Sequence, residues 1–137
     1  MTSIQDPPVA RLLTECNHAV CPTLNEDGSI HPTVVWVSVE HGRLAVNSAA
    51  GRHWPINLDR DLRITVLIED EHNPNAYVEV RGEATVGPDP EGHIDRLAKN
   101  YLGKDSYPFR QPGEQGMPFL VEPTLVRQDG RTPLRPS

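Results

Sequence analysis

The stretch of the sequence best suited to chemistry is Asn47–Asp61, which reads NSAAGRHWPINLDRD. A predicted strand runs there through two alanines and a glycine into a helix that begins with Arg52 and His53. The free N–H groups and the positive end of a helix attract anions, and a guanidinium adds to that attraction. A charge-assisted contact between arginine and phosphate contributes about 1.5–3 kcal/mol. The pattern therefore indicates a phosphate site, with a surface arginine at a helix start as the alternative.

The motifs of the common catalytic classes do not occur in the sequence. It contains no GxSxG, no HExxH, no Walker loop and no GxGxxG after a strand. No histidines pair at metal-ligand spacing on one helix face, so we predict no metal site and expect each histidine at the surface or in a turn. No catalytic acid is identified, and we expect a bound cofactor to supply the difficult chemistry. The six histidines are His18, His31, His41, His53, His72 and His93.

Length and composition indicate a small protein that binds neither nucleic acid nor membranes. The chain has 137 residues, of which 36% are hydrophobic, so we expect residues 1–137 to form a single domain. The net charge of −6 argues against a general partner rich in phosphate groups. No apolar run approaches the roughly 20 residues that span a bilayer, so we expect a cytoplasmic protein. Cys16 and Cys21 are the only cysteines, and neither a redox pair nor a zinc site is expected from their spacing.

Three helices are predicted from their capping residues. Asp6 and Pro7 open the first, within residues 1–17, and the second spans Gly51–Asp61. Asp89 and Pro90 open the third. Its apolar residues follow the spacing of an amphipathic helix, and a glycine ends it. These residues are Ile94, Leu97, Ala98, Tyr101 and Leu102, followed by Gly103.

Six strands are predicted from β-branched residues and alternating polarity. Gly82, inside the most regular of them, indicates a bulge or a close backbone approach. Residues 73–75 and 104–118 are expected to form loops, and residues 128–137 a loosely ordered tail. The strands are Ala19–Leu24, Thr33–Val39, Arg43–Ser48, Leu62–Glu69, Tyr77–Val86 and Phe119–Arg127.

The order of these elements favours a mainly β protein. Consecutive strands with few, short helices are typical of an antiparallel barrel and not of a βαβ sheet. We expect six to seven strands in it. The strand Thr33–Val39 is apolar on both faces, so we expect the barrel interior to cover one face and a ligand or a partner subunit to cover the other.

Four segments together resemble the pyridoxamine 5'-phosphate oxidase-like superfamily. They are HPTVVWV, then RLAVNSAAGR with NLDRDLRITVLIED, then NPNAYVEVRGEATV, then EGHIDRLAKNYLGKDSYP. More narrowly, the chain is similar to the actinobacterial branch that uses the deazaflavin coenzyme F420. The resemblance covers residues 20–127, which is nearly the whole folded chain.

This resemblance implies a split β-barrel of the FMN-binding type and a homodimer with cofactor grooves at its interface. It implies a reductase that transfers a hydride from reduced F420 to an unsaturated organic substrate, in a pocket built from loops 69–76 and 104–118. The backbone at residues 33–36 would lie along the cofactor ring, and polar residues of the next strand and helix would approach its ribityl and phosphate part. The cofactor contacts so assigned are Thr33, Val34, Val35, Trp36, Asn47, Ser48, Arg52, His53, Trp54 and Asn57.

Trp54 departs from the family pattern, because a lysine often stands two residues after the arginine. The loss of that cation leaves the identity of the cofactor open. The Trp54 ring can stack on a cofactor or substrate, or fill the subunit interface, and area burial favours the interface. Two alternatives to the F420 reductase therefore stay open. One is an FMN-dependent enzyme of the pyridoxamine 5'-phosphate oxidase-like type, and the other is a non-catalytic cofactor-binding or degenerate member.

Overall fold

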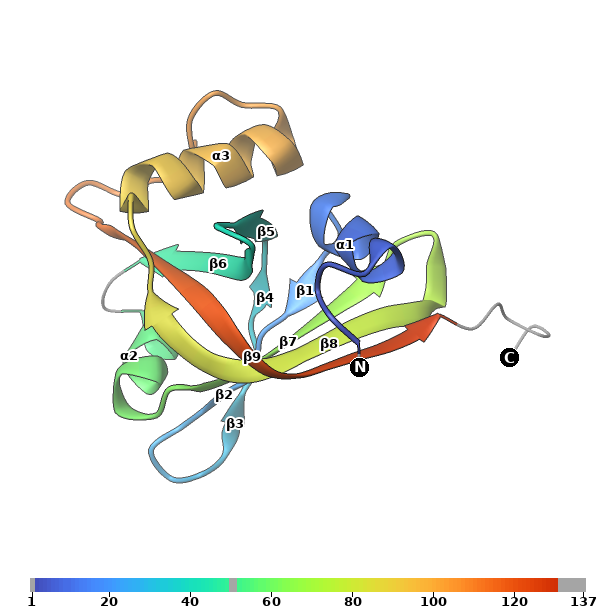
Figure 1. The fold of residues 1–137 in the computed structure, drawn as a ribbon. Coiled ribbons are helices and arrows are strands. Elements are labelled where there is room, and N and C mark those ends of the chain that lie inside the picture. The colour runs from blue at the N-terminus through green and yellow to red at the C-terminus, as the bar shows by residue number, and fades with distance from the viewer. Residues whose placement is uncertain (1, 50–51, 131–137) are drawn as a thin grey trace.

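The protein is organised around one large antiparallel sheet. In the computed structural model, which describes residues 2–49 and 52–130, seven strands pair in the order β4-β1-β7-β8-β9-β6-β5 (Figure 1). Strands β2 and β3 form a separate small hairpin. The strands are β1 Ala19–Val20, β2 Thr23–Leu24, β3 Ile30–His31, β4 Val34–Val35, β5 Val37–Glu40, β6 Arg43–Ala49, β7 Arg63–Asp70, β8 Asn73–Val86 and β9 Gly116–Gly130.

The sheet nearly closes on itself at Trp36. Strands β4 and β5 occupy the two ends of the strand order, yet only Trp36 separates them in the chain. One continuous segment therefore supplies both edges of the sheet, and the seven strands form a nearly closed barrel. This confirms the predicted mainly β, antiparallel barrel.

The described residues form three helices beside the barrel: α1 Pro7–Thr14, α2 His53–Arg60 and α3 Pro90–Leu102. The capping residues predicted for α3 are confirmed. The Asp89 side chain accepts a hydrogen bond from the Gly92 N–H, and Gly103 adopts a φ of 69° after the last turn. In Figure 1, α3 lies over the end of the barrel that holds β5 and β6, while α1 lies near the opposite ends of β7 and β8.

The core follows the alternation that the sequence predicts. On β7, Ile64, Val66 and Ile68 are buried, while Arg63, Leu67 and Glu69 on the other face are exposed. The next strand continues the same interior face with Val78, Val80 and Ala84, and α1 adds Val9, Leu12 and Leu13. Each such aliphatic side chain contributes about 1.5–3 kcal/mol on burial. Val86 continues this alternation in the sequence but is exposed, because it lies at the end of the strand.

Two of the predicted strands are each divided in two. Pro22 has no N–H to donate, so the ladder stops after Cys21 and the expected strand Ala19–Leu24 becomes β1 and β2 in different sheets. The expected strand Thr33–Val39 is divided at Trp36, where the chain crosses from one edge of the sheet to the other.

Strands β8 and β9 are longer than predicted. Residues 73–75 start β8 and do not form a loop, because the chain already reverses at residues 71–72 and Asp70 pairs with Asn73. Strand β9 begins at Gly116, inside the expected loop 104–118. It continues through residues 128–130, which pair with residues 76–78 of β8 and so are not a loose tail. Residues 131–137 of the predicted tail and Gly51 of the predicted helix lie outside the described residues.

Within residues 2–49 and 52–130, no helix is both long and apolar enough to cross a bilayer.

Gly82 provides the first testable prediction. A Cβ atom at this position would lie 2.0 Å from the backbone oxygen of Glu122, beside the register shift between β8 and β9. We expect Gly82→Ala to lower the free energy of unfolding by about 1–3 kcal/mol, because backbone on the neighbouring strand must move. The matched control is Gly87→Ala, whose Cβ would meet side chains and no backbone, the nearest being Leu120 at 3.3 Å. Equal urea midpoints for the two variants would contradict this close approach.

Candidate functional site

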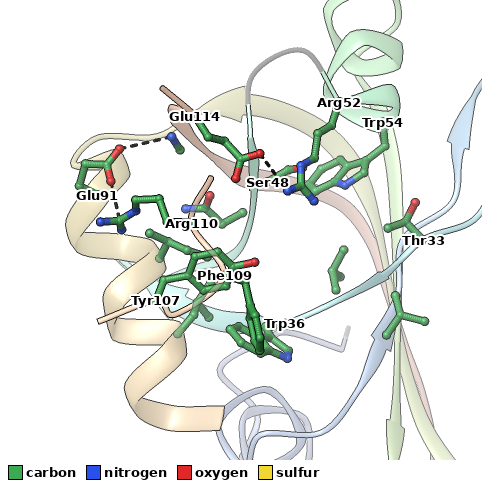
Figure 2. Close-up of a pocket in the computed structure, with 16 residues that line it drawn as sticks. Thr33, Trp36, Ser48, Arg52, Trp54, Glu91, Tyr107, Phe109, Arg110 and Glu114 are labelled. Atoms are coloured by element: carbon green, nitrogen blue, oxygen red, sulfur yellow. Dashed lines mark hydrogen bonds and ion pairs between the residues drawn. The ribbon is translucent and has the colours of Figure 1, made fainter. Parts of the chain in front are cut away.

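A cavity of about 220 Å3 lies beside β4 and β6, next to the loop of residues 103–115 that joins α3 to β9. Figure 2 shows Trp36, Tyr107 and Phe109 on one side of the cavity, and Arg52 and Trp54 on the other. Eight of the ten predicted cofactor contacts meet here. They are Thr33, Val34, Val35, Trp36, Asn47, Ser48, Arg52 and Trp54.

The other two predicted contacts, His53 and Asn57, lie in a separate open depression and not in this cavity. Asn57 is buried and donates hydrogen bonds to Thr23 Oγ1 at 3.1 Å and to Asn25 Oδ1 at 3.0 Å. The His53 ring stacks on His31, with centroids 4.2 Å apart. Both residues therefore connect α2 to the β2–β3 hairpin. They do not reach the cavity, because the helix starts there and these side chains point away from it.

Along β4, every second residue directs its backbone N–H and C=O groups away from the sheet, where a ligand could bind them. Thr33 and Cys21 exchange both of their backbone hydrogen bonds, at 2.7 and 3.3 Å. In an antiparallel ladder such pairs alternate, so Val35 bonds to β1 while the polar backbone groups of Val34 and Trp36 point to the open edge. Of the four residues expected along a cofactor ring, these two direct backbone groups away from the sheet.

Aromatic side chains form one wall of the cavity. The Trp36 ring stacks on Tyr101 of α3, with centroids 5.1 Å apart and an interplanar angle of 12°. Tyr107 meets the edge of Trp36, and Phe109 meets the edge of Tyr107. Phe109 remains 59% exposed although it lines the cavity. The wall therefore offers a planar apolar ligand a ring on which it can stack.

The charged side chains of the cavity are already paired with one another. Arg52, the N-cap residue of α2, donates to Glu114 Oε2 at 2.9 Å across the cavity. Arg110 pairs with Glu91 at 3.1 Å (Figure 2), and it also pairs with Asp95 of α3 at 3.0 Å. These ion pairs connect both halves of loop 103–115 to the helices, and an anion that binds Arg52 competes with Glu114 for its guanidinium. The sequence did not reveal this competition, since Arg52 and Glu114 are 62 positions apart.

Trp54 belongs to the core of the subunit. Its side chain is 4% exposed in the single chain, and its ring packs against Phe119 with centroids 5.5 Å apart. The expected packing of Trp54 at a subunit interface is therefore wrong, because almost no surface is left for a partner to cover. One edge of the ring still lines the cavity.

His93 lies next to the cavity-lining Asn47, and sequence reasoning missed it. It was expected at the surface, but it is 1% exposed and bonds to two side chains, Ser38 Oγ at 2.9 Å and Asn47 Nδ2 at 2.8 Å. Burial lowers the pKa of His93 below the usual value for histidine. Its position four residues before Leu97, on the apolar stripe of α3, is the signal that could have found it. Ser38 does not line the cavity, so the trio is not arranged for nucleophilic attack on a bound ligand.

The two cysteines are free thiols. Cys21 is fully buried, and burial raises the pKa of its thiol to about 12. Cys16 donates to the backbone oxygen of Asn100 at 3.0 Å. Within the described part of the chain, no three His, Cys, Asp or Glu side chains are grouped as a metal site.

The fold has relatives among solved structures. An F420 reductase is 23% identical, with a TM-score of 0.71 over 85% of this chain and 93% of that one. A conserved hypothetical protein from Mycobacterium tuberculosis is 20% identical, with a TM-score of 0.73 over 94% and 85% of the chains. A putative pyridoxamine 5'-phosphate oxidase from Listeria innocua is 18% identical, with a TM-score of 0.67 over 88% and 94%.

These similarities are ones of fold. No family model matches the sequence, and no curated protein matches it. The class that the coordinates define is the split β-barrel found in the F420 reductase and in the pyridoxamine 5'-phosphate oxidase-like structure. The resemblance inferred from the sequence is confirmed at this level.

The location of Asn57 generates a second prediction. We expect Asn57→Ala to lower the free energy of unfolding by about 1–3 kcal/mol, because it leaves buried polar partners without a donor. The affinity for FMN and for F420 should stay within about twofold of wild type, since Asn57 does not reach the cavity. Chemical denaturation and fluorescence titration measure the two effects. A large loss of affinity in a folded Asn57→Ala protein would contradict this assignment.

Proposed function

We propose that this protein is an F420-dependent oxidoreductase that acts on an unsaturated organic substrate at the cavity beside β4. The observation that carries the proposal is the convergence there of an open strand edge, an arginine at a helix start and an aromatic wall. A solved F420 reductase with the same fold supports the choice of cofactor. Because a deazaflavin is regenerated inside cells, we also expect the protein to act in the cytoplasm.

The residues of the cavity fit a phosphorylated flavin or deazaflavin. Arg52 and the N–H groups at the start of α2 would hold the phosphate, with the Ser48 hydroxyl nearby. The outward backbone groups of Val34 and Trp36 would hold the polar edge of the ring. When bound, the reduced cofactor supplies a hydride to the substrate.

The side chains of this protein would orient the two reactants and exclude water. Ile94 and Leu97 give the cavity an apolar floor, while Phe109 offers an exposed ring against which a planar substrate can lie. Stacked reactants gain rate from proximity, which is worth about 7–11 kcal/mol in well-oriented systems. Loop 103–115, which carries Tyr107 and Phe109, would therefore determine much of the substrate preference.

We further propose that a second copy of the chain completes the site. The cavity of about 220 Å3 is smaller than the roughly 300–1,000 Å3 of ligand pockets in proteins. Val34 lines it and yet is 67% exposed. Val20 and Leu67 follow Val34 in cross-strand register, and both are also exposed. A homodimer that covers this apolar row would enlarge and close the cleft.

The test of the cofactor is direct binding. We expect reduced F420 to bind with a micromolar or lower dissociation constant in a fluorescence titration, and to be oxidised when an enone substrate is added. Tighter binding of FMN, or a yellow protein on purification, would favour the FMN-dependent alternative. Binding without turnover of any substrate would favour a non-catalytic carrier. Failure to bind either cofactor would refute the proposal.

Arg52 provides the third prediction. We expect Arg52→Ala to weaken cofactor binding about tenfold or more, because a charge-assisted contact with phosphate contributes about 1.5–3 kcal/mol. Stability should change little, since Arg52 is exposed and its ion pair with Glu114 is near the surface. The affinity of each cofactor is measured by fluorescence, with Arg43→Ala on β6 as the control for loss of an exposed arginine outside the cavity. Unchanged affinity in Arg52→Ala would remove Arg52 from the phosphate site.

Glu114 provides the fourth prediction, in which affinity rises. We expect Glu114→Gln to tighten cofactor binding about twofold to fivefold, because the ligand no longer displaces an ion pair of about 0.5–1 kcal/mol. The matched control is Glu91→Gln, which removes a carboxylate from the same cavity that pairs with Arg110 and not with Arg52. If both variants tighten binding equally, the cause is general repulsion between the carboxylates and the phosphate. Competition between Glu114 and the ligand for Arg52 would then be ruled out.

A further inference from the structure

His93 lies behind the candidate site, and the proposed function does not use it. Its ring is buried between α3 and the two strands β5 and β6, from which Ser38 and Asn47 reach its two nitrogens. Asn47 lines the cavity, whereas His93 does not. A buried ionisable group is therefore joined to the cavity through a single amide.

The hydrogen bonds around Asn47 fix the tautomer of His93. Asn47 Oδ1 accepts from the backbone N–H of Met117 at 3.3 Å, so this end of the amide is the oxygen. The other end, Nδ2, must then donate to His93 Nδ1 at 2.8 Å. It follows that Nδ1 carries no proton, and that Nε2 carries the proton and donates it to Ser38 Oγ. The ring is held in one neutral tautomer.

An amide nitrogen has two hydrogens, and the bond to His93 uses only one of them. Asn47 lines the cavity, and within the described residues no hydrogen bond uses the second one. We propose that His93 is a positioning residue, whose neutral ring holds the Asn47 amide as a hydrogen-bond donor to the ligand and whose protonation switches that donor off. This inference rests on the proposed function and adds to it a pH-dependent control of the same site.

Protonation of His93 would disrupt this arrangement for a geometric reason. With hydrogens on both ring nitrogens, Nδ1–H would face the Asn47 amino group, and two donors would meet. Rotating the amide by half a turn would bring Oδ1 to His93 but would place the amino group against the Met117 N–H. Either arrangement loses a hydrogen bond and moves the free hydrogen of Asn47. Burial also disfavours the charged ring and so lowers the pKa of His93.

Other charged groups face His93 from the elements packed around it. Glu40 on β5 and Asp89 before α3 are both bonded to Arg96, which lies one turn after His93 on α3. His41 lines the same small space and is a second ionisable histidine. Glu40, Asp89 and Arg96 are already bonded to one another in an ion-pair network. The control for the pH dependence is therefore a substitution of His41.

Two substitutions of His93 each keep one of its two hydrogen bonds and remove the other. Asparagine places an amide atom near the position of Nδ1 and keeps the contact with Asn47, whereas glutamine reaches the position of Nε2 and keeps the contact with Ser38. At pH 7.5 we expect His93→Asn to bind reduced F420 and FMN within about twofold of wild type. We expect His93→Gln to bind them about 3- to 10-fold more weakly, the equivalent of one lost hydrogen bond. Equal affinities in the two variants would overturn the inference, because a purely structural role predicts similar effects.

The pH profile tests the switch itself. We expect the affinity of wild type, divided by that of His93→Asn, to fall as the pH is lowered from 7.5 to 5. The ratio cancels the ionisation of the ligand phosphate, which has a second pKa of about 6. His41→Asn should keep the profile of wild type, since His41 has no contact with Asn47. A flat ratio, or a profile that His41→Asn abolishes, would overturn the inference.

A measurement without ligand separates this inference from the proposed function. In 15N-labelled protein, the side-chain amide signals of Asn47, identified by their loss in Asn47→Ala, should shift in step with the His93 ring signals as the pH falls. The inference would be overturned if the Asn47 signals did not shift as His93 is protonated, or if the His93 ring stayed neutral down to pH 5. If Asn47 follows His93 but neither F420 nor FMN binds, the proposed function fails while the coupling of the two residues stands.

Discussion

The closure of the sheet at Trp36 is the constraint on which the candidate site depends. One residue joins the two strands that end the strand order, so this segment has to bend sharply from one edge of the sheet to the other. The bend leaves the outer backbone groups of β4 without a neighbouring strand at the cavity. An open edge of this kind attracts a further strand, a partner or a ligand. The stacking of Trp36 on Tyr101 then fixes α3, and with it the start of loop 103–115, against the same bend.

The electrostatics of the cavity follow from that packing. Arg52 and Arg110 are each bonded to a carboxylate of the same cavity, Glu114 and Glu91 respectively. In the proposed function, a phosphorylated ligand would compete with Glu114 for Arg52, so the ion pair offsets part of what the phosphate contact contributes. On the same proposal, shape, stacking and neutral donors such as the Asn47 amide would add to the selectivity. The hydrogen bonds that orient this amide would then contribute to binding alongside Arg52.

The parts of the fold that the sequence predicted well are those with strong local patterns. The cap at Asp89 and the glycine after α3 predicted both ends of that helix. Alternation predicted the buried face of β7, and Gly82 marked the close approach of β9. The division of Thr33–Val39 was missed because its residues are uniformly β-forming, and only the path of the chain around the barrel breaks the strand. Trp54 was assigned to an interface because its partner, Phe119, is remote in the sequence.

The sequence by itself determined the helices, most of the strands and the segment that lines the cavity. Each of these depends on neighbours within a turn of helix or along one strand. Only the tertiary structure decided which side chains are bonded at the site. Arg52 and Glu114 are 62 positions apart, and Asn47 and His93 are 46 apart. Such pairs form only once the barrel has closed and α3 has packed across β5 and β6, and no local pattern records that event.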